Sequence, residues 1–348
     1  MIELFVGKHR VVSIIGMAKN AGKTVALNHL IEELGDAEIP VALTSIGRDG
    51  ETVDLVTQTD KPRVYVPRGT LIATAEQLFN LGETRMEVLE VTRHRTPMGK
   101  VMIARALADG FVQIGGPSTS SEIRDVSERM LALGAQVVLI DGALDRLSSA
   151  SQLVSDACIL STGASVNRYM NTTLQRTAQL AEIFKLPQTE DDWVRRAWIE
   201  AAEPMLVELR ANPDGSGEGK ELGTRPLGIR TMIGEGIRVA TQVDENSRYL
   251  IVKGSLVAET LRRFVESTPH FRSIEWVIGD ATDLFVDETT WKYLKRVGVR
   301  LSVVHPIRLL AITVNPTSPS GHSYDSALFR SKLQEMVGET PVIDVFDT

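Results

Sequence analysis

The sequence predicts an α/β fold in which helices flank a mostly parallel β-sheet, followed by a second, C-terminal α/β domain. In the first half of the chain, short apolar runs alternate with longer stretches whose apolar residues have helical spacing. This alternation is typical of parallel βαβ units. The length of 348 residues exceeds one ordinary domain. With 43% hydrophobic and 24% charged residues, the composition is that of a globular protein with an aliphatic core.

The elements of the first half follow from the length and period of each apolar run. Strands are predicted at Val11–Gly16, Val41–Ile46, Arg63–Val66, Phe111–Ile114, Gln136–Asp141 and Ala157–Ser161. Helices are predicted at Thr24–Leu34, Leu71–Asn80, Lys100–Asp109, Ser120–Leu133 and Asn171–Phe184. Each helix is long enough to carry a crossover between parallel strands.

A glycine-rich stretch marks the predicted domain boundary. Residues 212–224 contain four glycines and almost no apolar side chains, so they have too little surface to bury for stable folding. We therefore predict a first domain at residues 1–211, a linker at 212–224 and a C-terminal α/β domain at 225–348.

The C-terminal domain is predicted from the same alternation of short and long runs. Strands are expected at Tyr249–Val252, Trp276–Ile278, Arg300–Val304 and Leu309–Val314, with helices at Leu256–Glu266 and Thr289–Val297. A last helix at Ser326–Val337 and the run Pro341–Val345 fit either sheet, and the sequence leaves their placement open.

The strongest functional signal is a strand, a glycine-bearing turn and a helix start in residues 11–24. Backbone N–H groups of such a turn and of the helix N-terminus point at one place, as binding of a phosphate requires. Lys23 can reach the β- and γ-phosphates, and Gly22 lets the backbone approach without a Cβ atom. The predicted phosphate-binding residues are Gly16, Lys19, Asn20, Ala21, Gly22, Lys23 and Thr24.

The spacing of this turn differs from the usual phosphate-loop pattern by one residue. Five residues separate Gly16 from Gly22, where G-x-x-x-x-G-K-[ST] has four. The strand before and the helix after still favour a phosphate loop, and the sheet is predicted to be of the P-loop NTPase type. The alternative is a strand-to-helix turn that contains Gly-Lys-Thr by chance.

A phosphate loop needs a metal-binding carboxylate at the end of a neighbouring strand. Asp141 ends the apolar run Gln136–Asp141 and is predicted to lie at the carboxyl edge where the loop sits. We predict that Thr24 and Asp141 hold Mg²⁺, directly or through water. The alternative for Asp141 is a helix N-cap after a buried strand.

Two turns at other strand ends are further candidates. Arg48 and Asp49 follow the second strand, where Asp49 would orient water or Mg²⁺ and Arg48 would stabilise charge on the transferred phosphoryl group. Both are predicted, with Lys23, to be catalytic, and the alternative is a tight turn. Residues 114–122 either cap a helix through Ser120 or Ser121 with Glu122, or admit substrate past their glycines.

A polar loop near the C-terminus follows a predicted strand. Residues 315–325 are dense in turn-forming residues and would open at the carboxyl end of that strand. Asn315, Ser318 or Tyr324 would then face the nucleotide across a cleft. The alternative is a structural, proline-rich connection.

Other classes of function are disfavoured. With 38 Lys and Arg against 45 Asp and Glu, the net charge of −7 gives no general attraction for nucleic acid or anionic lipid. Six histidines without a metal-ligand spacing and one cysteine, Cys158 in an apolar run, predict no zinc site. No apolar stretch is long enough for a membrane span or a signal peptide, so the expected location is the cytoplasm.

Two polar clusters are expected to be structural. Arg93, His94 and Arg95 are predicted to form a solvated loop, with binding of an acidic partner as the alternative. Trp193 and Trp198 flank two arginines on a predicted helix, where packing and surface exposure explain them.

Several motifs together resemble one family. They are Gly-Met-Ala-Lys-Asn-Ala-Gly-Lys-Thr, Ser-Ile-Gly-Arg-Asp-Gly-Glu, Val-Leu-Ile-Asp-Gly-Ala-Leu-Asp-Arg and Val-Asn-Pro-Thr-Ser-Pro. On these the chain resembles the KamB subunit of lysine 5,6-aminomutase reactivases over most of its length. The phosphate loop by itself resembles those of dethiobiotin synthetase-like P-loop NTPases and of the nucleotide-binding protein of molybdopterin guanine dinucleotide synthesis.

The resemblance implies an ATPase that uses ATP and Mg²⁺. It would work with a second, MutS-related reactivase subunit on lysine 5,6-aminomutase, whose damaged cobalamin leaves on ATP hydrolysis. The cobalamin would belong to the mutase, and pairing of two copies of this chain is possible within such families. The alternatives are an ATP-dependent ligase or kinase acting on a small molecule, and a nucleotide-binding regulatory scaffold.

Overall fold

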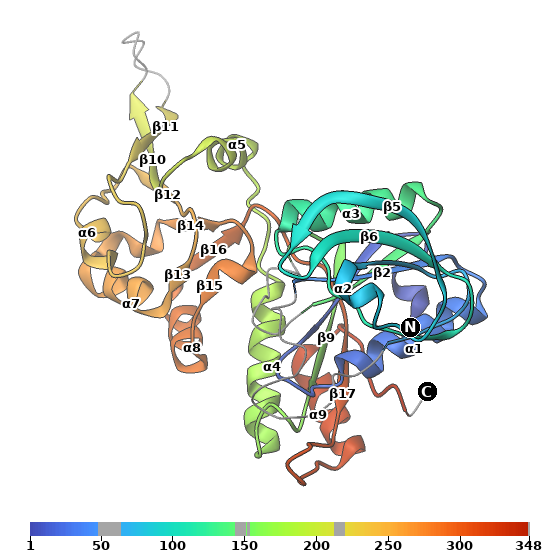
Figure 1. The fold of residues 1–348 in the computed structure, drawn as a ribbon. Helices are drawn as coiled ribbons and strands as arrows, with labels where there is room; N and C mark the ends of the chain where they lie inside the picture. The colour runs from blue at the N-terminus through green and yellow to red at the C-terminus, as the bar shows by residue number, and fades with distance from the viewer. Residues whose placement is uncertain (48–63, 143–150, 152–153, 212–219, 347–348) are drawn as a thin grey trace. The chain divides into compact units, whose positions relative to one another are not determined.

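The computed structural model describes residues 1–47, 64–142, 151, 154–211 and 220–346. The chain is an α/β protein with a large, mostly parallel sheet flanked by helices (Figure 1). It divides into two compact units. Unit 1 comprises residues 1–178 and 308–348, and unit 2 comprises residues 179–307. In the part of the chain that is described, no helix has both the length and the apolar character needed to cross a membrane.

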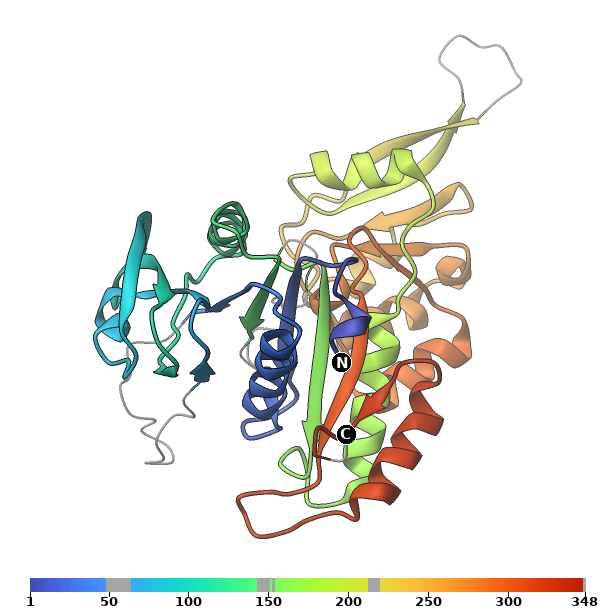
Figure 2. The same ribbon diagram turned by 90° about the vertical axis from the view of Figure 1, so that its right-hand side faces the viewer.

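Unit 1 is built on a nine-stranded sheet. Its strands, in spatial order, are β18 (Val342–Ile343), β17 (Leu309–Asn315), β9 (Ala157–Gly163), β1 (Val11–Gly16), β8 (Val137–Asp141), β2 (Val41–Ser45), β4 (Leu71–Ala75), β6 (Gly99–Ala106) and β5 (Met86–Thr96). Neighbours are parallel from β18 to β4, and β6 and β5 add antiparallel pairs. Figure 2 shows β1 in blue, β9 in green and β17 in orange-red running side by side.

Helices cover both faces of this sheet because successive residues of a strand point to opposite sides. The helices are α1 (Lys23–Asp36), α2 (Glu76–Phe79), α3 (Ser120–Ala132), α4 (Met170–Phe184) and α9 (Ser326–Val337). In β8, Val137 and Leu139 pack with the apolar side of α1, whereas Val138 and Ile140 pack with that of α3. The core of unit 1 therefore has two layers, one on each side of β8 and β1.

The antiparallel edge of unit 1 differs from the sequence prediction. Residues 71–80 and 100–109 were predicted to be helices, but they form β4 followed by the short α2, and β6. In β6, Val101 and Ile103 are fully buried while Lys100 is exposed. The buried positions there recur every second residue, as in a strand, and not every 3.6 residues, as in a helix. The predicted strand 111–114 also pairs elsewhere: β7 (Gly110–Val112) joins β3 (Val64–Val66) in a separate antiparallel pair.

Unit 2 has a five-stranded sheet in the order β11-β10-β12-β14-β16. The strands are β10 (Met205–Ala211), β11 (Lys220–Pro226), β12 (Ser247–Ile251), β14 (Glu275–Ile278) and β16 (Arg300–Val303), and a small pair joins β13 (Leu256–Val257) to β15 (Leu284–Phe285). The helices are α5 (Asp192–Glu200), α6 (Gly236–Ala240), α7 (Ala258–Ser267) and α8 (Glu288–Val297). In β14, Trp276 packs on Phe264 of α7, whereas Val277 packs with Val194 of α5. Helices α5 and α7 therefore cover opposite faces.

The two units divide the chain differently from the predicted domains. Residues 179–211 belong to unit 2, because β10 pairs with β11 and β12. Residues 308–348 return to unit 1, because β17 pairs with β9 and with β18. The glycine-rich residues 212–224 were predicted to separate two domains, yet residues 220–224 belong to β11, and β11 pairs with β10 inside unit 2.

Candidate functional site

The turn between β1 and α1 is held at the centre of the large sheet, since β1 lies between β9 and β8. Met17 donates its backbone N–H to Ser161 O of β9 at 2.9 Å. Asn20 and Gly22 then adopt left-handed φ angles of 62° and 101°, which turn the chain into α1. Gly22 is the N-cap of α1 and offers no side-chain cap, so the first N–H groups of the helix are available to an anion.

Lys23, the first residue of α1, folds back over the strand end. A Cβ atom placed on Gly16 would lie 2.7 Å from Lys23 Cγ and 2.9 Å from Cδ, so the lysine stem occupies the space that glycine leaves. Its Nζ donates to Gly142 O at 2.5 Å and lies 3.5 Å from Asp141 Oδ1. The ammonium group is therefore fixed at the carboxyl edge of β8.

Asp141 is the last residue of β8 and is in register with Ile14 of β1 and Ser45 of β2. Its Oδ1 atom is inaccessible to solvent and has no hydrogen-bond partner. Burial raises the pKa of this carboxyl, and the nearby Lys23 opposes the shift. A buried carboxylate oxygen with so little compensation favours a cation beside it.

Thr24 and Asp141 are the candidate residues for holding a cation at this edge. Thr24 is partly buried in the first turn of α1, close in sequence to the Lys23 that meets Asp141. Within the described ranges, no three His, Cys, Asp or Glu side chains form a group that could hold a metal ion. Mg²⁺ keeps several waters and needs only one or two protein oxygens together with substrate phosphates, so Thr24 and Asp141 fit it.

Asn315, at the end of β17, supports the turn from the other side. Its Nδ2 donates to Asn20 O at 3.2 Å. A Cβ atom on Gly22 would lie 3.1 Å from Asn315 Cβ, so glycine allows this close approach. Sequence reasoning placed Asn315 facing the nucleotide, and the structure shows it beside the phosphate-loop candidate.

The other two residues predicted from that loop have different partners. The Tyr324 hydroxyl donates to Asn167 O and lies 2.9 Å from Thr173 Oγ1 of α4. Ser318 donates its backbone N–H to His322 O at 3.0 Å within a local turn. Tyr324 therefore secures the 315–325 loop against α4.

The Gly115–Pro117 segment borders the same edge at the end of β2. Gly116 donates to Ser45 Oγ at 3.1 Å, and Gly47 donates to Pro117 O at 2.8 Å. Helix α3 then begins with Thr119 as its N-cap, which accepts a hydrogen bond from Glu122 N. The predicted capping role of this region is confirmed, with Thr119 as the cap in place of Ser120 or Ser121.

The remaining predicted catalytic residues, Arg48 and Asp49, lie outside the described residues. The Gly16–Thr24 turn, Asp141 and Asn315 are brought together. The backbone carbonyl of Gly142 was missed by sequence reasoning, since a carbonyl acceptor carries no residue-type signal.

The cluster Arg93–Arg95 is not a solvated loop, because it lies in strand β5. His94 is buried, with Nε2 2.5 Å from Asp125 Oδ2 of α3 and Nδ1 3.5 Å from Glu122 Oε1. Hydrogen bonds from Arg129 and then His94 lower the pKa of Asp125. These contacts fasten an edge strand to α3, so the cluster is structural.

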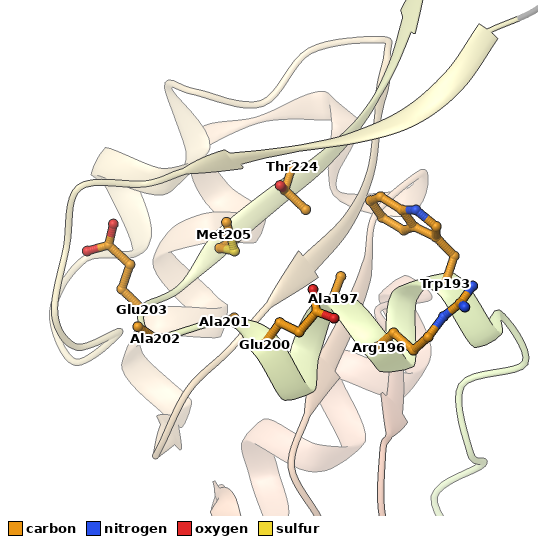
Figure 3. Close-up of a pocket in the computed structure, with 9 residues that line it drawn as sticks. All are labelled: Trp193, Arg196, Ala197, Glu200, Ala201, Ala202, Glu203, Met205 and Thr224. Atoms are coloured by element: carbon orange, nitrogen blue, oxygen red, sulfur yellow. The ribbon is translucent and has the colours of Figure 1, made fainter.

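A hollow in unit 2, between α5 and the β10–β11 pair, has a volume of about 660 Å³. It is lined by Trp193, Arg196, Ala197, Glu200, Ala201, Ala202, Glu203, Met205 and Thr224. Figure 3 shows Glu203 at one end and Trp193 with Arg196 at the other. Because the charged groups do not converge on one point, we assign no chemistry to this hollow.

Comparison of the chain with protein-family models, curated proteins and solved structures gave no match. The chemistry therefore rests on the turn itself. It combines a helix N-terminus, a fixed ammonium group and a buried carboxylate at the carboxyl edge of parallel strands, which suits a phosphorylated ligand with a divalent cation.

Proposed function

We propose that the protein is a P-loop NTPase that binds ATP with Mg²⁺ at residues 16–24 and hydrolyses it. The observation that carries the proposal is the Lys23 side chain, which folds over Gly16 and brings its Nζ within 3.5 Å of Asp141 Oδ1. The ammonium group of Lys23 thus lies beside the carboxylate of Asp141 at the carboxyl edge of β8.

Positively polarised and negatively charged groups of the site would bind different parts of the Mg²⁺–ATP complex. Backbone N–H groups of Gly22 and the first turn of α1 would bind phosphate oxygens, and Lys23 would leave Gly142 O for the β- and γ-phosphates. Thr24 and Asp141 would hold Mg²⁺, which would neutralise charge on the phosphates. Positioning and electrostatics supply most of the catalysis in phosphoryl transfer, and Arg48 and Asp49 remain the predicted catalytic contributors.

The proposed role follows the resemblance in sequence. The chain would act as the ATPase subunit of a reactivase for lysine 5,6-aminomutase, together with a MutS-related subunit, and release damaged cobalamin on hydrolysis. Basal hydrolysis would then be slow and would rise with the partners. A second candidate is a dethiobiotin synthetase-like ligase or kinase, in which the 315–325 loop, held beside the turn by the contact of Asn315 with Asn20, would help to bind the substrate.

The first experiment measures Mg²⁺-dependent ATP and GTP hydrolysis by the purified chain, alone and with the candidate mutase and second subunit. We expect Lys23→Ala to lower turnover by about a thousandfold, since it removes the cation that meets charge developing on the phosphates. The matched control is Lys253→Ala, at a lysine of unit 2 whose ammonium lies over the Trp198 ring, and it should keep wild-type turnover.

The possible results of this assay favour different functions. Stimulation by the mutase and its second subunit supports the reactivase. Fast hydrolysis without partners, with phosphate transferred to a metabolite, favours the small-molecule enzyme. Binding of nucleotide without turnover favours a regulatory scaffold, and equal activity of wild type and Lys23→Ala contradicts the site.

A further inference from the structure

The chain crosses between the units twice, once inside α4 and once just before β17, and both of these elements contact the Gly16–Thr24 turn. The first crossing lies inside α4, after Ala178, and the second lies after Ile307, immediately before β17. Within unit 1, α4 and β17 each contact the turn through a side chain. A change at the turn thus has a direct physical route to both segments that lead to unit 2.

Helix α4 contacts the turn through Thr177. Its Oγ1 lies 3.1 Å from Met17 Sδ and 2.8 Å from Thr173 O, two acceptors for its single hydrogen, and 2.8 Å from Thr162 Oγ1 of β9. Thr162, Thr173 and Thr177 are all fully buried, and their hydroxyl groups are hydrogen-bonded among themselves, to Thr173 O and to the Tyr324 hydroxyl. A buried hydroxyl that loses one partner must find another.

Strand β17 contacts the turn through Asn315, which donates to Asn20 O. Asn315 also accepts hydrogen bonds from Ala164 N and from Thr317 N, at 2.9 and 3.1 Å. A Cβ atom on Gly163 would lie 2.0 Å from Asn315 O, so β9 and β17 approach too closely for a side chain there. The position of Asn315 is therefore tightly determined.

The far end of α4 is held inside unit 2. Glu182 Oε2 accepts from Trp291 Nε1 of α8 at 2.7 Å and from Lys295 Nζ at 2.5 Å. Gln179 Nε2 donates to Val286 O at 2.9 Å. Although burial opposes it, hydrogen bonds from Lys295 and Trp291 lower the pKa of Glu182. A charged carboxylate thus links the last turns of α4 to α8.

We propose that α4 transmits the occupancy of the phosphate turn to unit 2, along the path from Met17 to Thr177, Glu182 and Trp291. The inference rests on the proposed nucleotide binding. A phosphate drawn to the turn reorients its peptide groups, Met17 follows its neighbours, and the contact of its sulfur with the buried Thr177 hydroxyl changes. Thr177 is then a positioning residue whose removal uncouples the units without emptying the nucleotide site.

The chain carries its own reporter for this coupling. Its four tryptophans, Trp193, Trp198, Trp276 and Trp291, all lie in unit 2, whereas the phosphate turn lies in unit 1. Tryptophan emission and its quenching by iodide therefore report on unit 2 alone. Radiolabelled ATP in equilibrium dialysis reports independently on binding. We expect Mg²⁺ with a non-hydrolysable ATP analogue to change tryptophan emission with the same midpoint as its binding.

The decisive variant is Thr177→Val, which keeps the shape of the side chain and removes the hydroxyl. We expect unchanged nucleotide affinity and loss of the emission change, with recovery in Thr177→Ser. Thr172→Val, the same change elsewhere on α4, is the control and should respond like wild type. Met17→Leu tests the same contact from its other side, should Thr177→Val fail to fold. Trp291→Phe should remove most of the signal if the path ends at that residue.

The outcomes separate this inference from the function on which it rests. Absence of nucleotide binding overturns the proposed function and the coupling together. Binding with no change in emission leaves the function standing and overturns the coupling. A full response in folded Thr177→Val, or in Met17→Leu, overturns the route through α4.

Discussion

The two units carry similar residues at similar places, yet the polar groups at the two edges differ in the partners that the fold gives them. In each unit, parallel strands end in an edge that presents lysine and aspartate, and ligands of open α/β sheets bind at such edges. Unit 1 presents Lys23 and Asp141, and unit 2 presents Lys253 after β12 and Asp280 after β14.

In unit 2 the charged groups already have protein partners. Lys253 Nζ lies 3.6 Å from the centre of the Trp198 ring and donates to Trp198 O at 3.0 Å. Asp280 accepts from Thr282 N at 2.8 Å and from Thr282 Oγ1 at 2.5 Å. These contacts fasten α5 and a short 3₁₀ turn to the strand ends, so the edge is structural.

In unit 1 the equivalent groups are left incomplete. Lys23 rests on the carbonyl of Gly142, and Asp141 Oδ1 has no hydrogen bond and only the ammonium 3.5 Å away. The residue types at a sheet edge therefore do not by themselves define a site. Among the described residues, what distinguishes unit 1 is the buried Asp141 Oδ1 atom, which has no hydrogen-bond partner.

Replacing one aspartate at each edge, Asp141 in unit 1 and Asp280 in unit 2, should give the largest difference in activity between the two edges. Asp141→Asn should reduce Mg²⁺-dependent hydrolysis by about a hundredfold, as loss of a group that places a metal commonly does. Nucleotide affinity measured in EDTA should stay the same or rise, because a negative charge near the phosphates is removed. The measurements are turnover against Mg²⁺ concentration and equilibrium dialysis.

The matched control is Asp280→Asn, which makes the same change at the edge of unit 2. It should leave hydrolysis and nucleotide binding at wild-type values, because the Asp280 carboxylate accepts hydrogen bonds from Thr282 within unit 2. If Asp141→Asn lost Mg²⁺-free binding as much as turnover while remaining folded, its role in placing the metal would be refuted.

The next prediction concerns Asp283, a carboxyl that the edge of unit 2 shields from solvent. Burial first, and then the neighbouring Asp280, raise the pKa of Asp283 to about 6. Since the pKa in the unfolded chain is lower, near 3.8, the carboxyl favours folding fully below about pH 4, and this contribution is lost as the pH rises through 6. We expect Asp283→Asn to be more stable than wild type at pH 8 by about 3 kcal/mol.

This difference should vanish toward pH 4, where wild type and variant both carry an uncharged group. Denaturant unfolding followed by tryptophan emission measures unit 2, because all the tryptophans lie there. Parallel pH curves for the two proteins would show that Asp283 titrates as an ordinary surface acid.

The parts of the fold that local pattern determines were predictable. Strands β1, β8 and β9 and their crossover helices follow from β-branched runs and helical periods. The antiparallel β6 was predicted as a helix, because Val101, Ile103, Ala104 and Ala106 fit a helical as well as a strand pattern when its partners β4 and β5 are unknown.

The pairing of β17 needed information that is not local. An apolar run such as Leu309–Asn315 suits the interior of either sheet. Its pairing with β9 is what assigns it to the sheet of unit 1. The phosphate turn was predictable from spacing because its chemistry depends on consecutive residues. The contact of Thr177 with Met17 was not, because a threonine on a helix carries no signal of what the fold brings to it.

The smallest expected effect compares one glycine from each edge. Gly254 follows β12 with a φ of +89° and has no atom within 4 Å of an added Cβ. Gly254→Ala should therefore cost only backbone strain, about 1 kcal/mol of unit 2 stability, with no change in ATP binding. Gly16 has no left-handed φ, but its added Cβ would lie 2.7 Å from Lys23 Cγ.

Gly16→Ala should for that reason keep stability and weaken ATP binding by about tenfold, because the flexible lysine moves aside and its ammonium leaves the edge. Thermal unfolding and equilibrium dialysis on both variants separate the two effects. The same added methyl group then lowers stability at the edge of unit 2 and lowers ATP binding at the edge of unit 1. Loss of ATP binding in Gly254→Ala, or unchanged binding in Gly16→Ala, would mean that the open edge of unit 1 is not the nucleotide site.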